Sequence, residues 1–453
     1  MDRAMTNTIA IIGGGFTGTL AAINLLRHGD AKLLLIERHA AAGEGLAYGA
    51  AHPAHLLNVR AANMSAFPDD PEHFRRWLAA HDVSADPNPF VPRLRYGDYL
   101  RDLLNEARTT AAGRLEIVHG DAVDVARTDA GTRVTLADGR VLAVDTAMLA
   151  VGNLPPHSPP GMGDLPAHLY APDPWAPGAL DGLGADDIVM ALGTGLTMVD
   201  VVLALRARGF AGQIVAMSRR GQLPHPHAAA TPPADPLRER PRETGSALLR
   251  RVRARANEIG WRPAIDELRR FTQDMWRAAS DNERARFLRH LRPWWDIHRH
   301  RIAPSVADAL EGLRTSGVLT ICGGRIVATQ AEGDCLAVSW RPRGETDAQT
   351  LRPARIINCT GPQGDLLRAD EPLLRALVAR GTIRPDTLRI GIDVDAQSRT
   401  IATNGTGNDW LYALGPMTRG AFWEIVAVPD IRVQSWSVAR RLANAQWVGG
   451  EGL

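Results

Sequence analysis

Short apolar runs alternate with segments of helical periodicity at the start of the chain. Residues 8–12 (TIAII) and 32–36 (KLLLI) have the length and composition of buried parallel strands. The segment between them carries apolar side chains at helical spacing, namely Leu20, Ile23, Leu25 and Leu26. This pattern predicts a strand, a helix and a second strand. The same order of elements is predicted for residues 187–218.

The rest of the pattern predicts further strands and two helical segments. Strands are expected at 115–118, 133–136, 141–149, 318–321, 337–340, 355–359 and 410–415, and a closing helix at 422–445. The Asp138-Gly139 pair is a turn signal that predicts a hairpin. Residues 244–313 read as mostly helical and rich in arginine, and residues 155–177 as a proline-rich hinge.

The first strand and helix are joined by a glycine-rich turn, Gly13-Gly14-Gly15-Phe16-Thr17-Gly18. Glycines at its first, third and sixth positions allow a sharp turn, close approach of a pyrophosphate and tight packing of helix on strand. The helix N-terminus faces the phosphate charge. Glu37 ends the next strand, where a carboxylate can hold ribose hydroxyls, and Arg38 follows it. The sequence therefore predicts a dinucleotide site here.

Four other glycine positions favour FAD at this first site. Gly45-Leu46 follows the second strand, where flavoproteins with two dinucleotide sites place glycines near the flavin. Gly152 and Gly361 end later strands that lead between domains. Gly415 ends a strand near the C-terminus, and a helix from about Trp423 can direct its N-terminus at the flavin. Many flavoproteins have an aspartate after that last glycine, whereas this chain has Pro416.

A second glycine turn, Gly193-Thr194-Gly195-Leu196-Thr197-Met198, lacks the third glycine and fits a looser NAD(P) site. The acidic residue that selects NAD is replaced by Ser218-Arg219-Arg220. Hydroxyl and guanidinium groups suit the 2′-phosphate of NADPH. We therefore expect an α/β fold with two Rossmann-like dinucleotide-binding domains. The FAD domain would comprise 1–160 and 355–453, and the NADPH domain 185–354 with a mostly helical insertion at about 240–313.

Composition narrows the function further. The chain has 453 residues and a formal charge of only +2, which gives no reason to expect nucleic acid or an anionic membrane as a partner. Cys322, Cys335 and Cys359 are too far apart for a redox dithiol or a zinc site. No apolar run approaches the roughly 20 residues of a membrane span, and no signal peptide is expected. A cytoplasmic protein without a metal is predicted, and a homo-oligomer stays possible.

Two loop stretches and one helical stretch carry a more specific resemblance. They are Gly45-Leu46-Ala47-Tyr48-Gly49 with His55-Leu56-Leu57-Asn58-Val59, then Met64-Ser65-Ala66-Phe67-Pro68, and residues 287–301 (FLRHLRPWWDIHRHR). With the glycine turns, they resemble the FAD/NAD(P)-binding flavin monooxygenases, the group that contains ornithine and lysine N-hydroxylases. The resemblance is strongest to the subfamily that contains an aspartate N-monooxygenase forming nitrosuccinate.

The resemblance implies an FAD-dependent monooxygenase that uses NADPH and molecular oxygen. A C4a-hydroperoxyflavin would hydroxylate the nitrogen of a small amino acid or amine, with an aspartate-like molecule as the first guess. Asn58 and Arg60 are the candidate catalytic residues near the flavin. A cationic cluster could bind substrate carboxylates: His290, Arg292, His298, Arg299 and His300. Alternatives are a solvated helix face for this cluster and, for the protein, an NADPH oxidase or dehydrogenase, or a non-catalytic flavin-binding module.

Overall fold

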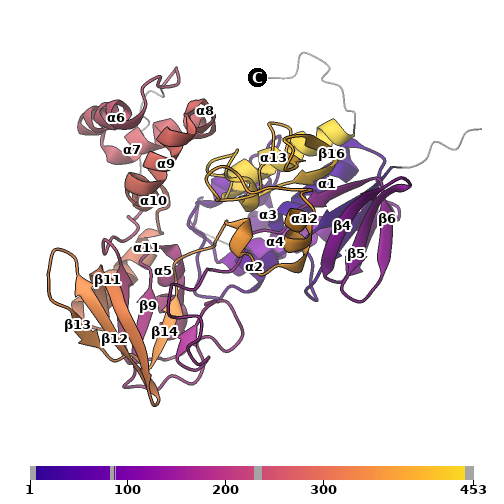
Figure 1. The fold of residues 1–453 in the computed structure, drawn as a ribbon. Helices are drawn as coiled ribbons and strands as arrows, with labels where there is room; N and C mark the ends of the chain where they lie inside the picture. The colour runs from indigo at the N-terminus through magenta and orange to yellow at the C-terminus, as the bar shows by residue number, and fades with distance from the viewer. Residues whose placement is uncertain (1–6, 82–85, 87, 229–236, 444–453) are drawn as a thin grey trace, which may run out of the picture.

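The computed structural model describes residues 7–81, 86, 88–228 and 237–443, which form two α/β units side by side (Figure 1). The first unit has a six-stranded sheet of order β15-β16-β7-β1-β2-β3. Its strands are β1 (Thr8–Ile12), β2 (Lys32–Glu37), β3 (Leu115–His119), β7 (Thr146–Leu149), β15 (Arg399–Ile401) and β16 (Gly407–Ala413). All pairings except that of β15 with β16 are parallel. The predicted first strand–helix–strand unit is confirmed.

The first unit also contains the helices α1 (Phe16–His28), α2 (Gly45–Gly49), α3 (His73–His81), α4 (Arg93–Thr110), α12 (Pro372–Ala379) and α13 (Val428–Leu442). Ten residues of α1 are buried, because the helix lies between the sheet, α4 and α13. The closing helix α13 begins at Val428 rather than at the predicted residue 422.

The second unit has a seven-stranded sheet of order β13-β12-β11-β10-β9-β14-β8. Its strands are β8 (Tyr170–Ala171), β9 (Ile188–Leu192), β10 (Gln213–Ser218), β11 (Leu319–Glu332), β12 (Cys335–Pro342), β13 (Gln349–Leu351) and β14 (Arg355–Asn358), and α5 (Leu196–Ala207) follows β9. β14 pairs with β9, so this sheet extends beyond the expected domain boundary at residue 355. All four residues of β14 are buried.

A smaller antiparallel sheet packs beside the first unit. It contains β4 (Ala122–Thr128), β5 (Gly131–Leu136) and β6 (Val141–Val144). Gly139, with φ +87°, makes the turn of the predicted hairpin between β5 and β6. The single strand predicted at 141–149 is in fact two strands, because the chain leaves the small sheet after Val144 and enters the large sheet as β7.

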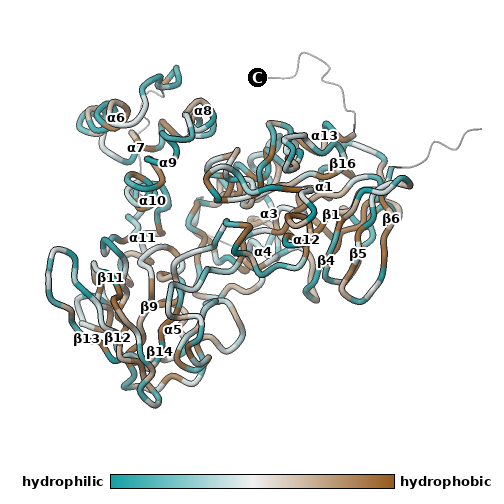
Figure 2. The backbone as a smooth tube through the Cα atoms, viewed as in Figure 1, coloured by the Kyte–Doolittle hydropathy of each residue, from teal (hydrophilic) through white to brown (hydrophobic). Residues whose placement is uncertain are grey.

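A helical insertion connects β10 to β11, as predicted. Its helices are α6 (Gly245–Ile259), α7 (Trp261–Leu268), α8 (Thr272–Ala278), α9 (Asp281–His290), α10 (Arg292–Arg299) and α11 (Pro304–Thr315). The insertion is largely hydrophilic (Figure 2). It contacts the first unit through Trp276, whose ring stacks on Trp423 with centroids 4.6 Å apart and whose Nε1 donates to the Gly420 carbonyl at 2.8 Å.

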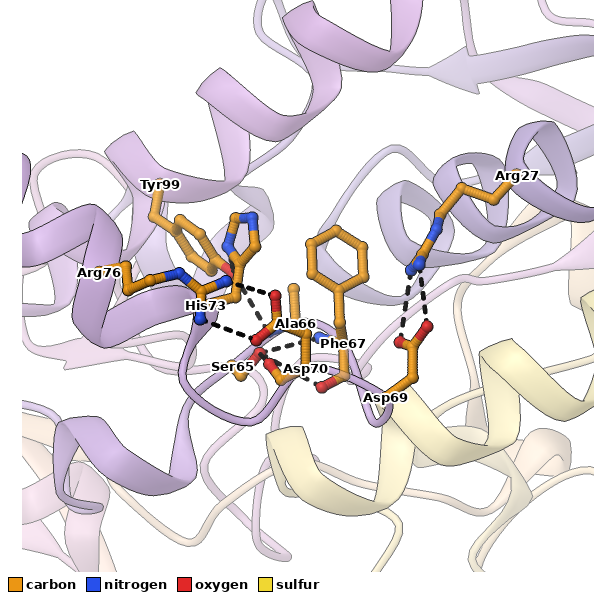
Figure 3. A network of polar contacts seen from close by, with 9 residues as sticks. All are labelled: Arg27, Ser65, Ala66, Phe67, Asp69, Asp70, His73, Arg76 and Tyr99. Carbon is orange, nitrogen blue, oxygen red and sulfur yellow. Dashed lines mark hydrogen bonds and ion pairs between the residues drawn. The ribbon is translucent and has the colours of Figure 1, made fainter. Parts of the chain in front are cut away.

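The stretch from Met64 to Pro68 is fixed by a network of polar contacts (Figure 3). The Ser65 hydroxyl accepts from the Phe67 amide at 3.1 Å and donates to the Asp70 carbonyl at 2.6 Å. The Tyr99 hydroxyl accepts from the Ala66 amide at 3.3 Å.

Short 3₁₀ turns occur at Ala61–Asn63, Arg269–Phe271, Leu366–Arg368 and Pro416–Thr418. In the described ranges we find neither a helix long and apolar enough to cross a membrane nor a cluster of metal-binding side chains.

Candidate functional site

The first glycine turn brings the backbone of β1 and α1 very close together. Gly13 has φ +105°, and a Cβ there would lie 2.4 Å from the Ala150 carbonyl oxygen. A Cβ on Gly18 would lie 1.8 Å from the Gly13 oxygen. Gly15 faces Gly45, whose Cβ would lie 2.8 Å from the Gly15 Cα. Larger side chains cannot be accommodated at these positions, so the turn and the N-terminus of α1 remain open to a phosphate group.

Glu37 is held at the end of β2 by two backbone amides. Its carboxylate accepts from Gly14 at 2.7 Å and from His39 at 2.8 Å, and the side chain is buried. A carboxylate has about four acceptor positions, so two stay available for ribose hydroxyls. The neighbouring Arg38 pairs with Glu371 at 2.9 Å and with Asp121 at 3.2 Å. This arrangement fits the predicted ribose site.

The second glycine turn has the same backbone geometry with one difference. Gly193 has φ +125°, and a Cβ there would lie 2.2 Å from the Cys359 carbonyl oxygen. Gly195 faces open space, with no atom within 4 Å of its Cβ position. Met198 stands in place of the third glycine and is fully buried in the core of this unit. The replacement of the third glycine by Met198 therefore changes the packing of the helix on the sheet, and it does not block the N-terminus of α5.

Two cations next to this turn have no carboxylate partner in the described part of the chain. Arg219 and Arg220 follow β10, and neither forms an ion pair or a hydrogen bond with the described residues. The Ser218 hydroxyl is oriented by bonds from Thr194 Oγ1 at 2.9 Å and from the Gly221 amide at 3.0 Å. An arginine pair beside an oriented hydroxyl can bind a phosphate.

One cavity of about 1690 Å³ joins the two glycine turns. Ordinary ligand pockets measure roughly 300–1,000 Å³, so this cavity is large enough for two extended ligands. It takes in most of the predicted cofactor residues: Gly13, Gly15, Phe16, Thr17, Glu37, Arg38, Gly45, Leu46, Asn58, Gly152, Gly193, Thr194, Gly195, Leu196, Thr197, Ser218, Arg219, Arg220 and Gly361. Gly18, Gly415 and Trp423 do not line it.

A partly buried ion pair connects the two units in the wall of this cavity. Arg93, at the start of α4, contacts Asp200 of α5 through both terminal nitrogens, at 2.8 and 3.0 Å. Nε2 of the buried His55 donates to the Asp200 carbonyl at 2.9 Å. Burial raises the pKa of Asp200, and the charges of Arg93 and His55 oppose that increase. Arg93 and Asp200 both line the cavity.

The predicted cationic cluster is divided by the structure. Arg292, Arg299 and His300 line the cavity, but His290 and His298 do not. Arg299 and His300 face the buried carboxylate of Glu424, at 3.3 and 3.7 Å. Burial raises the pKa of Glu424, yet the charges of His300 and Arg299, with hydrogen bonds from His300 and Trp295, bring it well below the usual value. Of the predicted members that line the cavity, Arg292 is the most available to a ligand, because its side chain is about half exposed and its ion pair with Asp296, at 3.3 Å, is open to solvent.

The two predicted catalytic residues lie in different surroundings. Asn58 lines the cavity, and its carbonyl accepts from His227 Nε2 at 3.0 Å. Arg60 lies outside the cavity lining, where its guanidinium covers the Phe90 ring at 4.6 Å and donates to the Asn88 carbonyl at 2.9 Å. Trp423 packs against Trp276 and Phe287 of the insertion instead of facing the cavity. Gly415 permits the C-terminal tail to approach Thr17, because a Cβ on residue 415 would lie 2.5 Å from Thr17 Oγ1.

The polar cavity residues that the sequence did not point to include Asn153, Arg419 and Asp200. Asn153 directly follows the predicted Gly152, and Arg419 follows the Gly415-Pro416 stretch. Both could have been found by extending the search a few residues past each strand-end glycine. Asp200 sits within an apolar helix, where a single buried acidic residue is the available signal.

Comparisons with known proteins agree with this geometry. Residues 10–154 match a family model described as FAD-NAD(P)-binding. A search of curated protein sequences found no match. Among solved structures, the ornithine hydroxylase of Pseudomonas aeruginosa is similar with a TM-score of 0.66 and 14% identity, covering 97% of this chain and 99% of that chain. The ornithine N-hydroxylase of Kutzneria sp. 744 gives 0.65 and 15%, covering 97% and 99%.

The predicted fold with two dinucleotide-binding domains is thereby confirmed, as is the FAD/NAD(P)-binding character of the first segment. The same fold also occurs in enzymes with another chemistry. The thioredoxin reductase of Lactococcus lactis is similar with a TM-score of 0.53 and 12% identity, covering 97% of this chain and 100% of that chain. Similarity of fold therefore does not by itself select the reaction.

Proposed function

We propose that this protein is an FAD-dependent, NADPH-using monooxygenase that hydroxylates the nitrogen of a small amino acid or amine. The observation that carries this proposal is the single cavity that joins the two glycine turns. FAD would occupy the β1–α1 turn, and NADPH would occupy the β9–α5 turn, so that the two redox rings meet between the units. The bound flavin would supply electron transfer from NADPH and the activation of molecular oxygen. The chain itself would supply binding and orientation.

The residues on the FAD side support this assignment. The N-terminus of α1 would hold the pyrophosphate, while Glu37 would accept hydrogen bonds from the adenosine ribose. Gly45 approaches Gly15 closely enough to enclose the cofactor without a side chain between them. The glycines at 152 and 361 line the cavity where the strands of the two units end. Arg38 is already paired with acidic residues, so we give it no direct role with phosphate.

The residues on the other side favour NADPH over NADH. Arg219 and Arg220 line the cavity and form no ion pair with the part of the chain that the structure describes, so both guanidinium groups are available to a 2′-phosphate. The β10 end lacks the carboxylate that would bind the 2′-hydroxyl of NADH. The remaining phosphate groups would face the amides at the start of α5, where Gly195 leaves room.

The cysteines argue against a disulfide reductase. All three are free, and their spacing along the chain matches no redox dithiol motif. Cys359 alone lines the cavity, but burial raises its pKa far above the usual value, which suppresses the reactive thiolate. Reduced flavin in this chain would therefore have no dithiol to receive its electrons. Molecular oxygen is the acceptor that fits the resemblance to N-hydroxylating enzymes.

The substrate class is proposed from the resemblance and from charge. The similar solved structures act, by their names, on ornithine, lysine and cadaverine. The resemblance of residues 45–68 and 287–301 adds an aspartate-like amino acid. Arg292 and Asn58 lie on the cavity wall and can orient a carboxylate and a polar nitrogen. An aspartate-like amino acid is the first substrate to test.

Product analysis tests the proposal directly. Purified protein with FAD should oxidise NADPH in air and convert one member of an amine panel, containing aspartate, ornithine, lysine and cadaverine, to an N-hydroxylated or further oxidised product. Stopped-flow mixing of reduced protein with oxygen should show a flavin species distinct from the oxidised and reduced forms. Quantitative release of hydrogen peroxide with every amine, without such a species, would instead establish an NADPH oxidase. Protein that takes up no FAD would refute both enzymatic functions.

A further inference from the structure

Arg419 is a buried cation in the cavity wall, and none of the residues that the structure describes gives it a carboxylate partner. Only 8% of the residue is exposed, and it directly follows the turn Pro416–Thr418. Its Nε donates to the Pro416 carbonyl at 3.1 Å, and its Nη2 donates to Asn153 Oδ1 at 3.2 Å. Both acceptors are neutral. Among the described residues, no carboxylate lies within ion-pair distance of this guanidinium.

The other deeply buried arginines of this chain are structurally satisfied. Arg301 is 4% exposed and forms a two-pronged ion pair with Asp266, at 2.9 and 3.0 Å. Arg355 donates to three backbone carbonyls at 2.7 to 3.1 Å. A guanidinium has five donors, and Arg419 uses two of them. Arg419 therefore retains donors that no described residue uses, and it lines the cavity.

The charge of Arg419 is poorly compensated where it stands. Burial, followed by the charge of Arg292, lowers the pKa of Arg419 to about 10, and Asp296 and Asp386 oppose this change without pairing with it. The Asp386 carboxylate accepts hydrogen bonds from the amides of Leu388 and Ile390, at 2.9 and 2.8 Å. An anion placed beside Arg419 would offset the cost of its burial and relieve the repulsion from Arg292.

We infer that Arg419, together with Arg292, binds a carboxylate group of the substrate; this inference rests on the proposed function. The two arginines come from different parts of the fold, Arg292 from α10 of the insertion and Arg419 from the C-terminal tail of the first unit. The pyrophosphate positions lie elsewhere, at the starts of α1 and α5. A planar carboxylate matches the two-pronged geometry of a guanidinium. The substrate would thus be an amino acid, and an amine without a carboxylate would bind weakly.

Binding measured without turnover tests this inference. Isothermal titration of the FAD-loaded protein would use L-aspartate, L-ornithine and putrescine, which is ornithine without its carboxylate. We expect one amino acid to bind. Its dissociation constant should rise about tenfold or more in Arg419→Met and recover in part in Arg419→Lys, since a charge-assisted hydrogen bond is lost and then replaced by a less directional one. Putrescine should bind weakly, and Arg419→Met should leave its affinity unchanged.

Two further variants and a second readout complete the test. Arg292→Met, at a half-exposed position, should raise the same dissociation constant about threefold or more even if Arg419→Met does not fold. Arg375→Met alters an exposed arginine of α12 and should change nothing. An unchanged amino-acid affinity in Arg419→Met would overturn the inference. A loss of FAD or a shift of the flavin potential in this variant, without a change in amino-acid affinity, would assign Arg419 to the flavin. Arginine-dependent binding without a hydroxylated product would refute the proposed function alone.

Discussion

Arg93 and Asp200 form an ion pair between the two dinucleotide-binding units, with contacts of 2.8 and 3.0 Å. Arg93 also donates through Nε to the Leu56 carbonyl at 3.2 Å, so one guanidinium connects α4, α5 and the loop that follows α2. His55 supports the same helix from the same loop. Both residues line the cavity that joins the two glycine turns.

Removing Arg93 should therefore impair both stability and hydride transfer. Arg93→Ala leaves the buried Asp200 carboxylate without its partner, which costs about 3–5 kcal/mol of unfolding free energy. We expect the rate of flavin reduction by NADPH to fall as well, because the relative position of the units is no longer fixed. Urea unfolding and anaerobic stopped-flow reduction would measure the two effects. The double variant Arg93→Ala with Asp200→Asn should be more stable than Arg93→Ala alone; equal stability would contradict the ion-pair explanation.

The 2′-phosphate assignment predicts a selective effect of Arg219→Ala. Loss of a charge-assisted hydrogen bond of about 1.5–3 kcal/mol should raise the Michaelis constant for NADPH by roughly ten- to a hundredfold. The constant for NADH should change little, because NADH has no phosphate at that position. Steady-state kinetics with both nucleotides measures the difference. Arg352→Ala, at a side chain that is 63% exposed and distant from the cavity, serves as the control. An equal effect on both nucleotides would refute the assignment.

Local patterns made the glycine turns predictable, whereas distant pairings were not visible in the sequence. Gly13 and Gly193 each follow a short apolar run, and such a run predicts a buried strand from local sequence alone. The strand from Arg355 to Asn358 would suit the interior of either sheet. Its pairing with β9 depends on contacts between residues that are far apart along the chain. Likewise, residues 287–301 indicate a cationic cluster but do not reveal that the buried Glu424 neutralises part of it. Sequence could therefore predict the cofactor turns better than the substrate surface.

Glu424 should stabilise the docking of the insertion in a pH-dependent way. Its pKa in the folded protein is depressed below the ordinary value of 4.5, so its contribution is present above that value and is lost as the pH falls through the folded pKa. Glu424→Gln should lower the unfolding free energy at pH 7 by about 3 kcal/mol, since it breaks a buried ion pair. The difference from the natural protein should shrink under acidic conditions.

Urea titrations of both proteins across the acid range would measure this difference. Glu311→Gln is the matched control, because Glu311 is 64% exposed and pairs with Arg314 on the surface of α11. It should change stability by less than about 1 kcal/mol at any pH. If Glu424→Gln loses as much stability in acid as at pH 7, hydrogen bonding by the side chain, and not its charge, holds the insertion in place.

The two glycines of the second turn should respond differently to alanine. Gly193→Ala places a Cβ 2.2 Å from the Cys359 carbonyl at φ +125°, so the protein should lose several kcal/mol of stability or fail to fold. Gly195→Ala meets no atom within 4 Å, so stability should change by less than about 1 kcal/mol. Its methyl group would nevertheless enter the space we assign to the NADPH pyrophosphate. The Michaelis constant for NADPH should therefore rise about tenfold or more while FAD content stays normal. Thermal unfolding and NADPH kinetics measure both effects, and tight NADPH binding by Gly195→Ala would place the nucleotide elsewhere in the cavity.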